Sequence, residues 1–383
     1  MKTQDELKIG CYINARQAFG KSVLKGILDW KKERIHCRVM NYAQMEGLDL
    51  FQPHGIIAQL GDERSHPFAK AQTIPLVNVS SALPHIPFPT VTADNEAVGA
   101  AGAAHLMNNG VKRLAFARYP WTHYSELRER GFTTEVARRG GELCPGLLMP
   151  REKEPQNPKG HPFTDSQMVW VQSLPAKCGV MTDCEGLGSA LIACAVELGR
   201  HVPDDIAVIA ADHEYWLSEL SDPPLSCVPL PGRVVGWRAA ELLASILEGA
   251  APPTEPILIP PGKLMVRQSS EVLQVPDEHV REAMRFIRAH PGQNLGVPEV
   301  VRVSGVSRRS LEMKFRVHLN RTIREVIEGA HLKEALRLLE ETTLPMEEVS
   351  DAAGFANVQR MAQLVKATSG LTPLSYRKQR RDG

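Results

Sequence analysis

The sequence lacks the short motifs that mark several common classes of enzyme. No GxGxxG follows the first predicted strand and no GxxxxGK(S/T) occurs, so neither a dinucleotide site nor a P-loop is indicated. GxSxG and HExxH are also missing, which argues against a serine-hydrolase elbow and a zinc-protease helix. The 13 histidines are scattered without the spacing of metal ligands. We therefore predict a protein that is not an enzyme and that needs no cofactor or metal ion.

Long hydrophobic runs and paired cysteines are absent too. No stretch reaches roughly 18 uninterrupted apolar residues, the length of a membrane-spanning helix, and no secretion signal follows the polar start of the chain. The seven cysteines show no CxxC spacing, which fits buried free thiols in a reducing compartment. Hydrophobic residues make up 43% and charged residues 23% of the 383 positions, as in soluble chains of two or three domains. The prediction is a soluble cytoplasmic protein without membrane contact.

Neither sign of charge dominates, since the net charge is +1. The distribution is uneven, because residues 1–276 hold 27 basic and 30 acidic side chains whereas residues 277–383 hold 18 basic and 14 acidic ones. A nucleic-acid partner is therefore sought first in the C-terminal segment, and an ordinary solvated surface is the alternative explanation of the same surplus.

Short β-rich runs alternate with amphipathic stretches up to about residue 273. The expected strands are residues 7–13, 55–60, 74–79, 113–117, 179–182 and 206–210, and the expected helices are residues 23–32, 95–108 and 187–198. Such alternation is typical of open parallel α/β sheets, in which ligands bind at the carboxyl ends of the strands. Two sheets that face one cleft would account for a segment of this length.

The same segment resembles the sugar-binding part of the LacI/GalR family. The resemblance rests on an ordered series of motifs: TADNEAVG at 92–99, AHL at 104–106, NGVKRLAF at 109–116, RERGF at 128–132, VMTD at 180–183, ELGRHVPDDI at 197–206 and IAAD at 209–212. It implies a periplasmic-binding-protein-like fold of two α/β lobes joined by three crossovers, which close on a small molecule. The family's N-terminal helix-turn-helix has no counterpart ahead of residue 7, so a DNA reader is expected elsewhere in the chain.

The resemblance also implies which residues contact the effector. Arg128, Asp183 and Asp212 stand where the family has its ligand-contacting Arg, Asp or Asn, and Asp. Planar polar groups of this kind bind sugar hydroxyls through paired, charge-assisted hydrogen bonds. An ordinary surface or interlobe ion pair is the alternative for each of them. Further candidates are the stacking residues Trp121 or Trp216 and, in the loop after the first strand, Arg16 and Phe19.

Strand character disappears after Pro276. Helices are expected at residues 278–290, 298–304, 308–319, 323–341, 346–353 and 359–369, and two of the junctions place Gly305 and Gly354 in a tight turn between helices. Together with ALRLLEETT at 335–343 and GLTPLSYR at 370–377, this pattern resembles the AraC/XylS family of DNA-binding domains. The resemblance implies an all-α domain of two helix-turn-helix units at residues 274–383, downstream of a sensor at residues 1–273.

In each unit the second helix is expected to lie in the major groove, with its first residues at base edges and the two helices roughly 34 Å apart. Leu311 and Phe315 form the buried stripe of the first reading helix. Arg reads guanine, Glu accepts from cytosine, and Asn or Gln suits adenine. The expected contacts of the first unit are Ser307, Arg308, Arg309, Ser310 and Glu312, with Lys314 and Arg316 on phosphates. Those of the second unit are Asn357, Gln359, Arg360 and Gln363.

The second reading helix departs from the family pattern. The family usually has Phe where Met361 and Val365 stand, and Met and Val still fill a core. It often has a basic residue at the position of Gln363, so the contribution of this helix to DNA binding is in question.

A LacI-like sensor followed by an AraC-like reader implies a sugar-responsive, sequence-specific transcriptional regulator. The resemblance implies a pentose effector, D-xylose, and the alternatives are another sugar or a non-sugar metabolite. The expected partners are promoter DNA with repeated half-sites, a second copy of the chain as a homodimer, and RNA polymerase. A DNA-repair methyltransferase needs a zinc-bound cysteine cluster, and a transport binding protein needs a signal peptide; the sequence favours neither.

Overall fold

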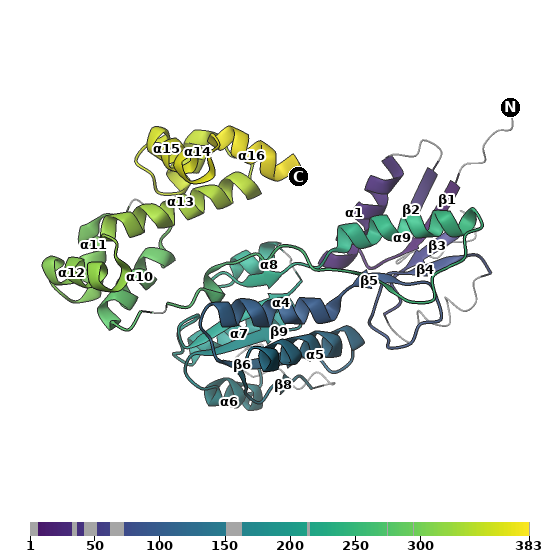
Figure 1. The fold of residues 1–383 in the computed structure, drawn as a ribbon, viewed down its shortest axis with the longest axis horizontal. Coiled ribbons are helices and arrows are strands. Elements are labelled where there is room, and N and C mark those ends of the chain that lie inside the picture. Colours follow the sequence, from purple (N-terminus) through teal and green to yellow (C-terminus); the bar gives the residue numbers. More distant parts are fainter. Residues whose placement is uncertain are drawn as a thin grey trace. The chain divides into compact units, whose positions relative to one another are not determined.

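The computed structural model describes residues 7–32, 37–41, 52–61, 73–150, 163–212, 215–273, 275–293 and 295–382 (Figure 1). The chain divides into two compact units, Met1–Val272 and Leu273–Gly383. Among the described residues, no helix combines the length and the apolar character needed to cross a membrane.

The first lobe of the N-terminal unit is built on a parallel sheet in the order β2-β1-β3-β4. Its strands are β1 (Leu7–Tyr12), β2 (Cys37–Asn41), β3 (Gly55–Ala58) and β4 (Leu76–Asn78). Helices α1 (Ala18–Lys32) and α9 (Gly232–Leu247) pack on this sheet, and their apolar residues share one core with β1 and β3. Helix α1 begins five residues before the predicted helix. Helix α9 belongs to this lobe although it lies much later in the sequence.

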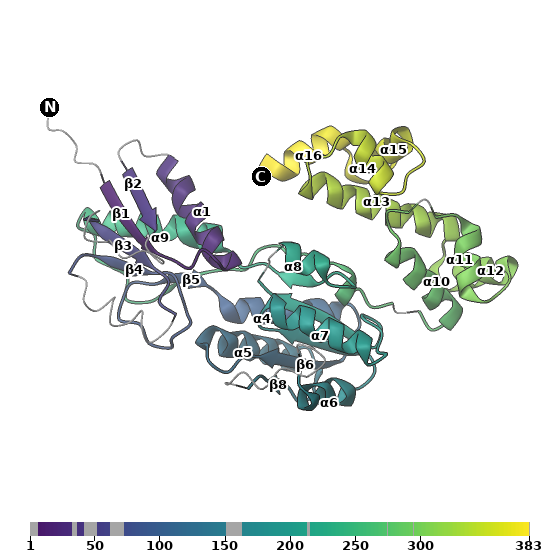
Figure 2. The ribbon, with the colours of Figure 1, turned by 180° about the vertical axis from the view of Figure 1, so that it is seen from behind.

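The second lobe holds a parallel sheet in the order β11-β10-β9-β6-β7, with β8 also paired to β6. Its strands are β6 (Arg113–Arg118), β7 (Glu142–Leu143), β8 (Leu147–Leu148), β9 (Cys178–Thr182), β10 (Ile206–Ala211) and β11 (Ser226–Val228). Helices cover both of its faces (Figures 1 and 2), and each face has its own core. One contains α4 (Asn95–Asn108) and α5 (His123–Arg138), and the other contains α6 (Asp165–Ser173) and α7 (Glu185–Glu197). The central strands β9 and β10 are buried along their whole length, as parallel strands between two helical layers should be.

Three segments connect the two lobes. Strand β5 (Val91–Ala93) pairs in parallel with β12 (Ile257–Ile259), and the chain leaves β5 directly for α4. It returns after β11 to α9, and it crosses again after β12, where Met265 pairs with Cys227 and the short helix η1 (Gln268–Ser270) follows. Helix α8 (Tyr215–Leu220) completes this unit. The predicted fold of two α/β lobes with three crossovers is confirmed.

Each lobe contains a pair of helices that cross at glycines. A Cβ atom on Gly26 of α1 would lie 1.9 Å from the carbonyl oxygen of Arg233, and one on Gly236 of α9 would lie 2.0 Å from that of Val23. The α4–α5 crossing is built in the same way, since a Cβ on Gly99 would lie 1.9 Å from the carbonyl oxygen of Arg128. The helix backbones therefore touch, and no larger residue fits at these positions without moving a helix.

The C-terminal unit is entirely helical. Its helices are α10 (Glu278–Ala289), α11 (Val297–Ser304), α12 (Arg308–Leu319), α13 (Ile323–Glu341), α14 (Met346–Ala352), α15 (Val358–Ser369) and α16 (Pro373–Asp382). Six of these follow the predicted ranges to within a residue at each end. The two predicted turn glycines, Gly305 and Gly354, have φ of +70° and +79°, a conformation that glycine adopts without steric cost.

Helix α13 belongs to both helix-turn-helix units. Its first turns contribute Ile323 and Ile327 to a core with α10, α11 and α12, and its last turns contribute Ala335 and Leu339 to a core with α14, α15 and α16. The two units are therefore held on one continuous helix (Figure 1).

We expect Gly236→Ala to lower the free energy of unfolding by about 1–3 kcal/mol, because the new methyl group forces α1 and α9 apart. Gly186→Ala in α7 is the matched control. A Cβ there meets no atom within 4 Å, so this change should be neutral or stabilise by less than about 1 kcal/mol. Urea unfolding followed by circular dichroism measures both, and equal effects of the two substitutions would contradict the close helix crossing.

Candidate ligand pocket and DNA interface

A pocket of about 260 Å³ lies between the two lobes and is lined by both of them and by the crossover segments. The first lobe contributes the loop after β1 and the ends of β3 and β4, and the second lobe contributes α4, α5, the start of α7 and the end of β10. These are the carboxyl ends of parallel strands, where ligands of such sheets bind. The polar and aromatic wall consists of Arg16, Gln17, Phe19, Gln59, Ser80, Ser81, Thr92, Asn95, Tyr124, Arg128, Cys184, Glu185 and Asp212.

Arg128 is the most firmly held of the predicted ligand residues. Its side chain is buried, and its Nε donates to Asn95 Oδ1 at 2.9 Å while Nη1 donates to the carbonyl oxygen of Asp183 at 2.5 Å. The guanidinium also lies over the ring of Tyr124, 4.7 Å from its centroid. A guanidinium has five N–H donors, so this arrangement fixes its plane and leaves further donors for a ligand in the pocket.

Asp212 and Glu185 bring two carboxylates to the same pocket. Asp212 follows β10 with φ of +75°, and its backbone N–H donates to the carbonyl oxygen of Val228 at 3.0 Å. A left-handed residue at a strand end in a cleft is typical of a functional position. Glu185 begins α7, directly after β9. Glu185 was not among the predicted ligand residues, although the sequence carries a signal for it: a carboxylate at the start of a helix that follows a buried strand.

Asp183 occupies a different place from the one predicted for it. It is 1% exposed and does not line the pocket, since its Oδ2 accepts hydrogen bonds from Tyr119 N at 2.9 Å and Ser125 Oγ at 2.6 Å. Burial raises the pKa of this carboxyl group above its usual range. The side chain turns toward the loop ahead of α5, and the carbonyl group of the same residue binds Arg128. Asp183 therefore positions Arg128 through its backbone carbonyl group and does not line the pocket itself. The neighbouring Cys184 does line the pocket.

The remaining candidates divide in the same way. Arg16 and Phe19 line the pocket, as predicted from the loop that they share. Trp121 does not: it is 44% exposed and packs against Tyr119, with ring centroids 4.6 Å apart. The loop between β6 and α5 turns outward at this point, so the side chain of Trp121 does not reach the pocket. The side chain of Trp216 lies outside the described residues.

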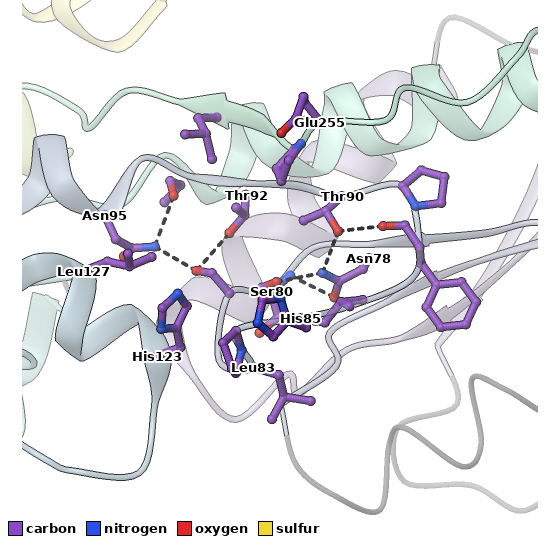
Figure 3. A pocket seen from close by; sticks show the side chains of 18 of the residues that line it. Asn78, Ser80, Leu83, His85, Thr90, Thr92, Asn95, His123, Leu127 and Glu255 are labelled. Carbon is purple, nitrogen blue, oxygen red and sulfur yellow. Dashed lines mark hydrogen bonds between the residues drawn. The ribbon is translucent and has the colours of Figure 1, made fainter.

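A larger hollow of about 550 Å³ lies beside this pocket (Figure 3). Ser81, Thr92 and Asn95 line both, and Ser81 Oγ accepts hydrogen bonds from Thr92 Oγ1 at 3.4 Å and Asn95 Nδ2 at 2.8 Å. Side chains such as His85 and Glu255 line the larger hollow, but none of the predicted ligand residues does. Arg128, Glu185 and Asp212 line the smaller pocket and not the larger hollow.

Metal binding finds no support in the described parts of the chain. No three His, Cys, Asp or Glu side chains in those parts are grouped so that they could hold an ion. The seven cysteines are free, and burial raises the pKa of Cys11, Cys184 and Cys227 to about 12, which keeps these thiols protonated and inert.

The second helix of the first helix-turn-helix unit, α12, is formed as the sequence predicts. Ser307 caps it, accepting from Ser310 N at 3.3 Å, and Leu311 and Phe315 are fully buried. Arg308, Arg309 and Glu312 are exposed. Arg308 Nε donates to Glu312 Oε1 at 2.8 Å, an ion pair within the exposed surface of the helix.

Lys314 departs from its predicted role as a phosphate contact. Its ammonium group pairs with Asp277, the residue that caps α10, and this pairing lowers the pKa of the Asp277 carboxyl group. Lys314 lies on the side of α12 that faces α10, and its positive charge is paired with a carboxylate of the same helix-turn-helix unit. Arg316 remains exposed on the outer side of the same helix.

The second reading helix, α15, repeats this design with different side chains. Asn357 caps it, accepting from Arg360 N at 2.8 Å, and Met361 and Val365 are fully buried in place of the family's usual Phe residues. Gln359 and Gln363 are exposed. Arg360 is exposed as well, but its Nη2 donates to Glu328 Oε2 of α13 at 2.8 Å. Its positive charge is therefore partly balanced by a carboxylate of the protein.

Comparison with known proteins supports both halves of this description. A family of periplasmic binding protein-like domains matches residues 103–270, and a helix-turn-helix domain family matches residues 300–379. The xylose operon regulatory protein of Escherichia coli K12 is 27% identical over 97% of this chain and 96% of its own length. That of Haemophilus influenzae is 25% identical over 98% of this chain and 99% of its own length. The solved structure of the xylose-binding transcription activator xylR superimposes with a TM-score of 0.79, at 26% identity and 99% coverage of both chains.

The burial of Asp183 predicts a specific pH dependence of stability. Because its pKa is raised in the folded state, its stabilising contribution is complete below the unfolded pKa of about 3.9 and is lost as the pH rises through the folded pKa. Asp183→Asn removes the buried charge, so its stability relative to the wild type should increase between pH 4 and pH 7. Urea unfolding across this range measures the difference. Glu142→Gln, at an exposed carboxylate of the same lobe, should show no such trend, and a flat difference for Asp183→Asn would contradict the assignment.

Proposed function

Since the chain is a transcription regulator of the type that joins a periplasmic-binding-protein-like sensor to an AraC/XylS-type helix-turn-helix domain, and not an enzyme, we propose that it controls promoters in response to a sugar, with D-xylose as the effector. Promoter DNA with repeated half-sites is its second ligand. It binds there as a homodimer and contacts RNA polymerase, in the cytoplasm where the DNA is.

The pocket composition carries the sugar proposal. Arg128, Glu185 and Asp212 supply planar charged groups that can each make paired hydrogen bonds to neighbouring hydroxyls. Phe19 and Tyr124 supply aromatic surface for the C–H face of a sugar ring. The pocket, at about 260 Å³, is smaller than the 300–1,000 Å³ of typical drug-sized sites. A small polyol is the ligand that suits this combination.

Xylose in particular is supported by the names of the relatives. The relatives from Escherichia coli and Haemophilus influenzae are named xylose operon regulatory proteins, and the similar solved structure is titled a xylose-binding transcription activator. Another pentose, a hexose or a non-sugar metabolite is the alternative effector. Binding can change transcription only by the difference in affinity between two states of the protein, and closure of the two lobes about β5 and β12 is the state change that we propose.

Calorimetric titration with D-xylose, D-ribose, L-arabinose, D-galactose and D-glucose tests the effector, and we expect saturable binding of D-xylose. Asp212→Asn and Arg128→Lys should each weaken binding by about 10- to 100-fold, because each removes hydrogen bonds to a charged group. Trp121→Ala, outside the pocket, is the control and should keep wild-type affinity. Binding of another sugar would replace the effector, and unchanged affinity of the pocket variants would contradict the assigned site.

The reading helices predict how DNA variants should differ. Arg309→Ala should cost about 1–3 kcal/mol on the operator and relax the preference at one base pair, because Arg reads guanine through two hydrogen bonds. Arg316→Ala, at a phosphate contact, should weaken all sequences equally and reduce the salt dependence of binding. Fluorescence anisotropy with operator and scrambled duplexes at several salt concentrations measures both. Equal losses on all sequences for Arg309→Ala would make it a phosphate contact.

A further inference from the structure

The reading helix α12 presents an apolar side chain where charged ones are expected. Met313 is 62% exposed and lies between the exposed Glu312 and the half-buried Lys314. Isolated exposed apolar side chains are common on proteins, so exposure alone assigns no role. The position of Met313 on the helix is what matters.

Met313 lies opposite the buried stripe of α12. Successive residues of an α-helix are rotated by about 100°, so the direction away from the buried pair Leu311 and Phe315 passes close to Met313. Arg309 lies one turn earlier on the same face. Arg308 and Glu312 pair with each other on the neighbouring face, at 2.8 Å. The stripe that projects furthest from the core therefore contains Arg309 and then Met313.

The second unit supports this choice of position. Gln363 lies six residues after the capping residue Asn357 of α15, as Met313 lies six residues after the capping residue Ser307 of α12. The buried pairs also correspond, because Met361 and Val365 follow their cap at the same distances as Leu311 and Phe315. One position of the repeated unit is thus a thioether in the first reading helix and an amide in the second.

We propose that Met313 reads thymine, by contact of its thioether side chain with the C5 methyl group in the major groove, beside the guanine read by Arg309. This inference rests on the proposed DNA-binding function. Thymine is the one base that presents an apolar group in the major groove, and the flexible, polarisable side chain of Met packs well against a methyl group. The amide of Gln363 suits adenine instead, so the two helices would read different bases at equivalent positions.

Replacement of thymine by deoxyuridine tests the proposal, because it removes only the methyl group. An operator is first selected from a random duplex pool with the full-length protein. Each thymine is then replaced in turn, and the dissociation constants of wild type and Met313→Ala are measured by fluorescence anisotropy. We expect one thymine per half-site whose replacement weakens wild-type binding about fourfold, the effect of one buried methyl group. Met313→Ala should lose the same factor on the thymine operator and be insensitive to that replacement, whereas Met313→Leu should keep the sensitivity.

Val317→Ala is the matched control. Val317 is also apolar and is 73% exposed, one turn further from the start of the helix, and its loss should leave the response to deoxyuridine as in the wild type. The proposal would be overturned if deoxyuridine weakened the binding of Met313→Ala as much as that of the wild type. It would also be overturned if replacement of no thymine weakened binding of the wild type. If no sequence is enriched from the random pool, the proposed DNA-binding function itself is contradicted. Failure of the thymine proposal and failure of the DNA-binding function are therefore distinguishable.

Discussion

The buried guanidinium of Arg128 constrains most of the sensor around it. A charged group taken from water must have its N–H donors satisfied by fixed acceptors. Here the acceptors come from Asn95 at the start of α4 and from the carbonyl group of Asp183 after β9, while Tyr124 packs on its face. Three elements of one lobe are thereby held in fixed register at the edge of the pocket. The glycine crossing of α4 and α5 is needed for this, because only touching helices bring Asn95 within reach of Arg128.

Helix α4 connects this arrangement to the end of the sensor. It begins at Asn95 in the pocket wall, and at its other end Asn109 Nδ2 donates to the carbonyl oxygen of Ser270 at 2.9 Å. His105 Nε2 shares a hydrogen bond of 2.7 Å with Ser270 Oγ, and burial lowers the pKa of this histidine. Ser270 lies just before the C-terminal unit begins at Leu273. Helix α4 therefore joins the pocket wall to the last residues of the sensor through fixed hydrogen bonds.

The sequence predicted those elements whose pattern is set by burial alone. Strands β9 and β10 are continuous apolar runs between helical layers, and α12 and α13 carry caps and periodic apolar residues. Helices α5 and α9 were not predicted. Helix α5 is polar over most of its length, since its buried positions include Arg128, Ser125 and Gly131, and α9 packs on a lobe whose other elements lie more than a hundred residues earlier.

The site residues show where such reasoning ends. Arg128, Asp212, Arg16 and Phe19 line the pocket because they stand at strand ends or in a helix that faces it. Asp183 also stands at a strand end, but its direction depends on Tyr119 in the loop after β6 and on Ser125 in the first turn of α5. Lys314 is bound by a carboxylate 37 positions earlier. The direction of such a side chain depends on partners that are distant in sequence. The periodicity of the sequence does not reveal these partners.

The length of α13 gives the DNA reader its geometry. Its 19 residues span about 28 Å at 1.5 Å per residue, and each end forms part of the core of one helix-turn-helix unit. Because both cores use the same helix, α13 links α12 to α15. The exposed side chains of the two helices differ: α12 carries Arg308, Arg309, Glu312 and Arg316, and α15 carries Gln359, Arg360, Gln363 and Lys366. The two helices thus carry different exposed chemistry, and the shared helix α13 holds both of them.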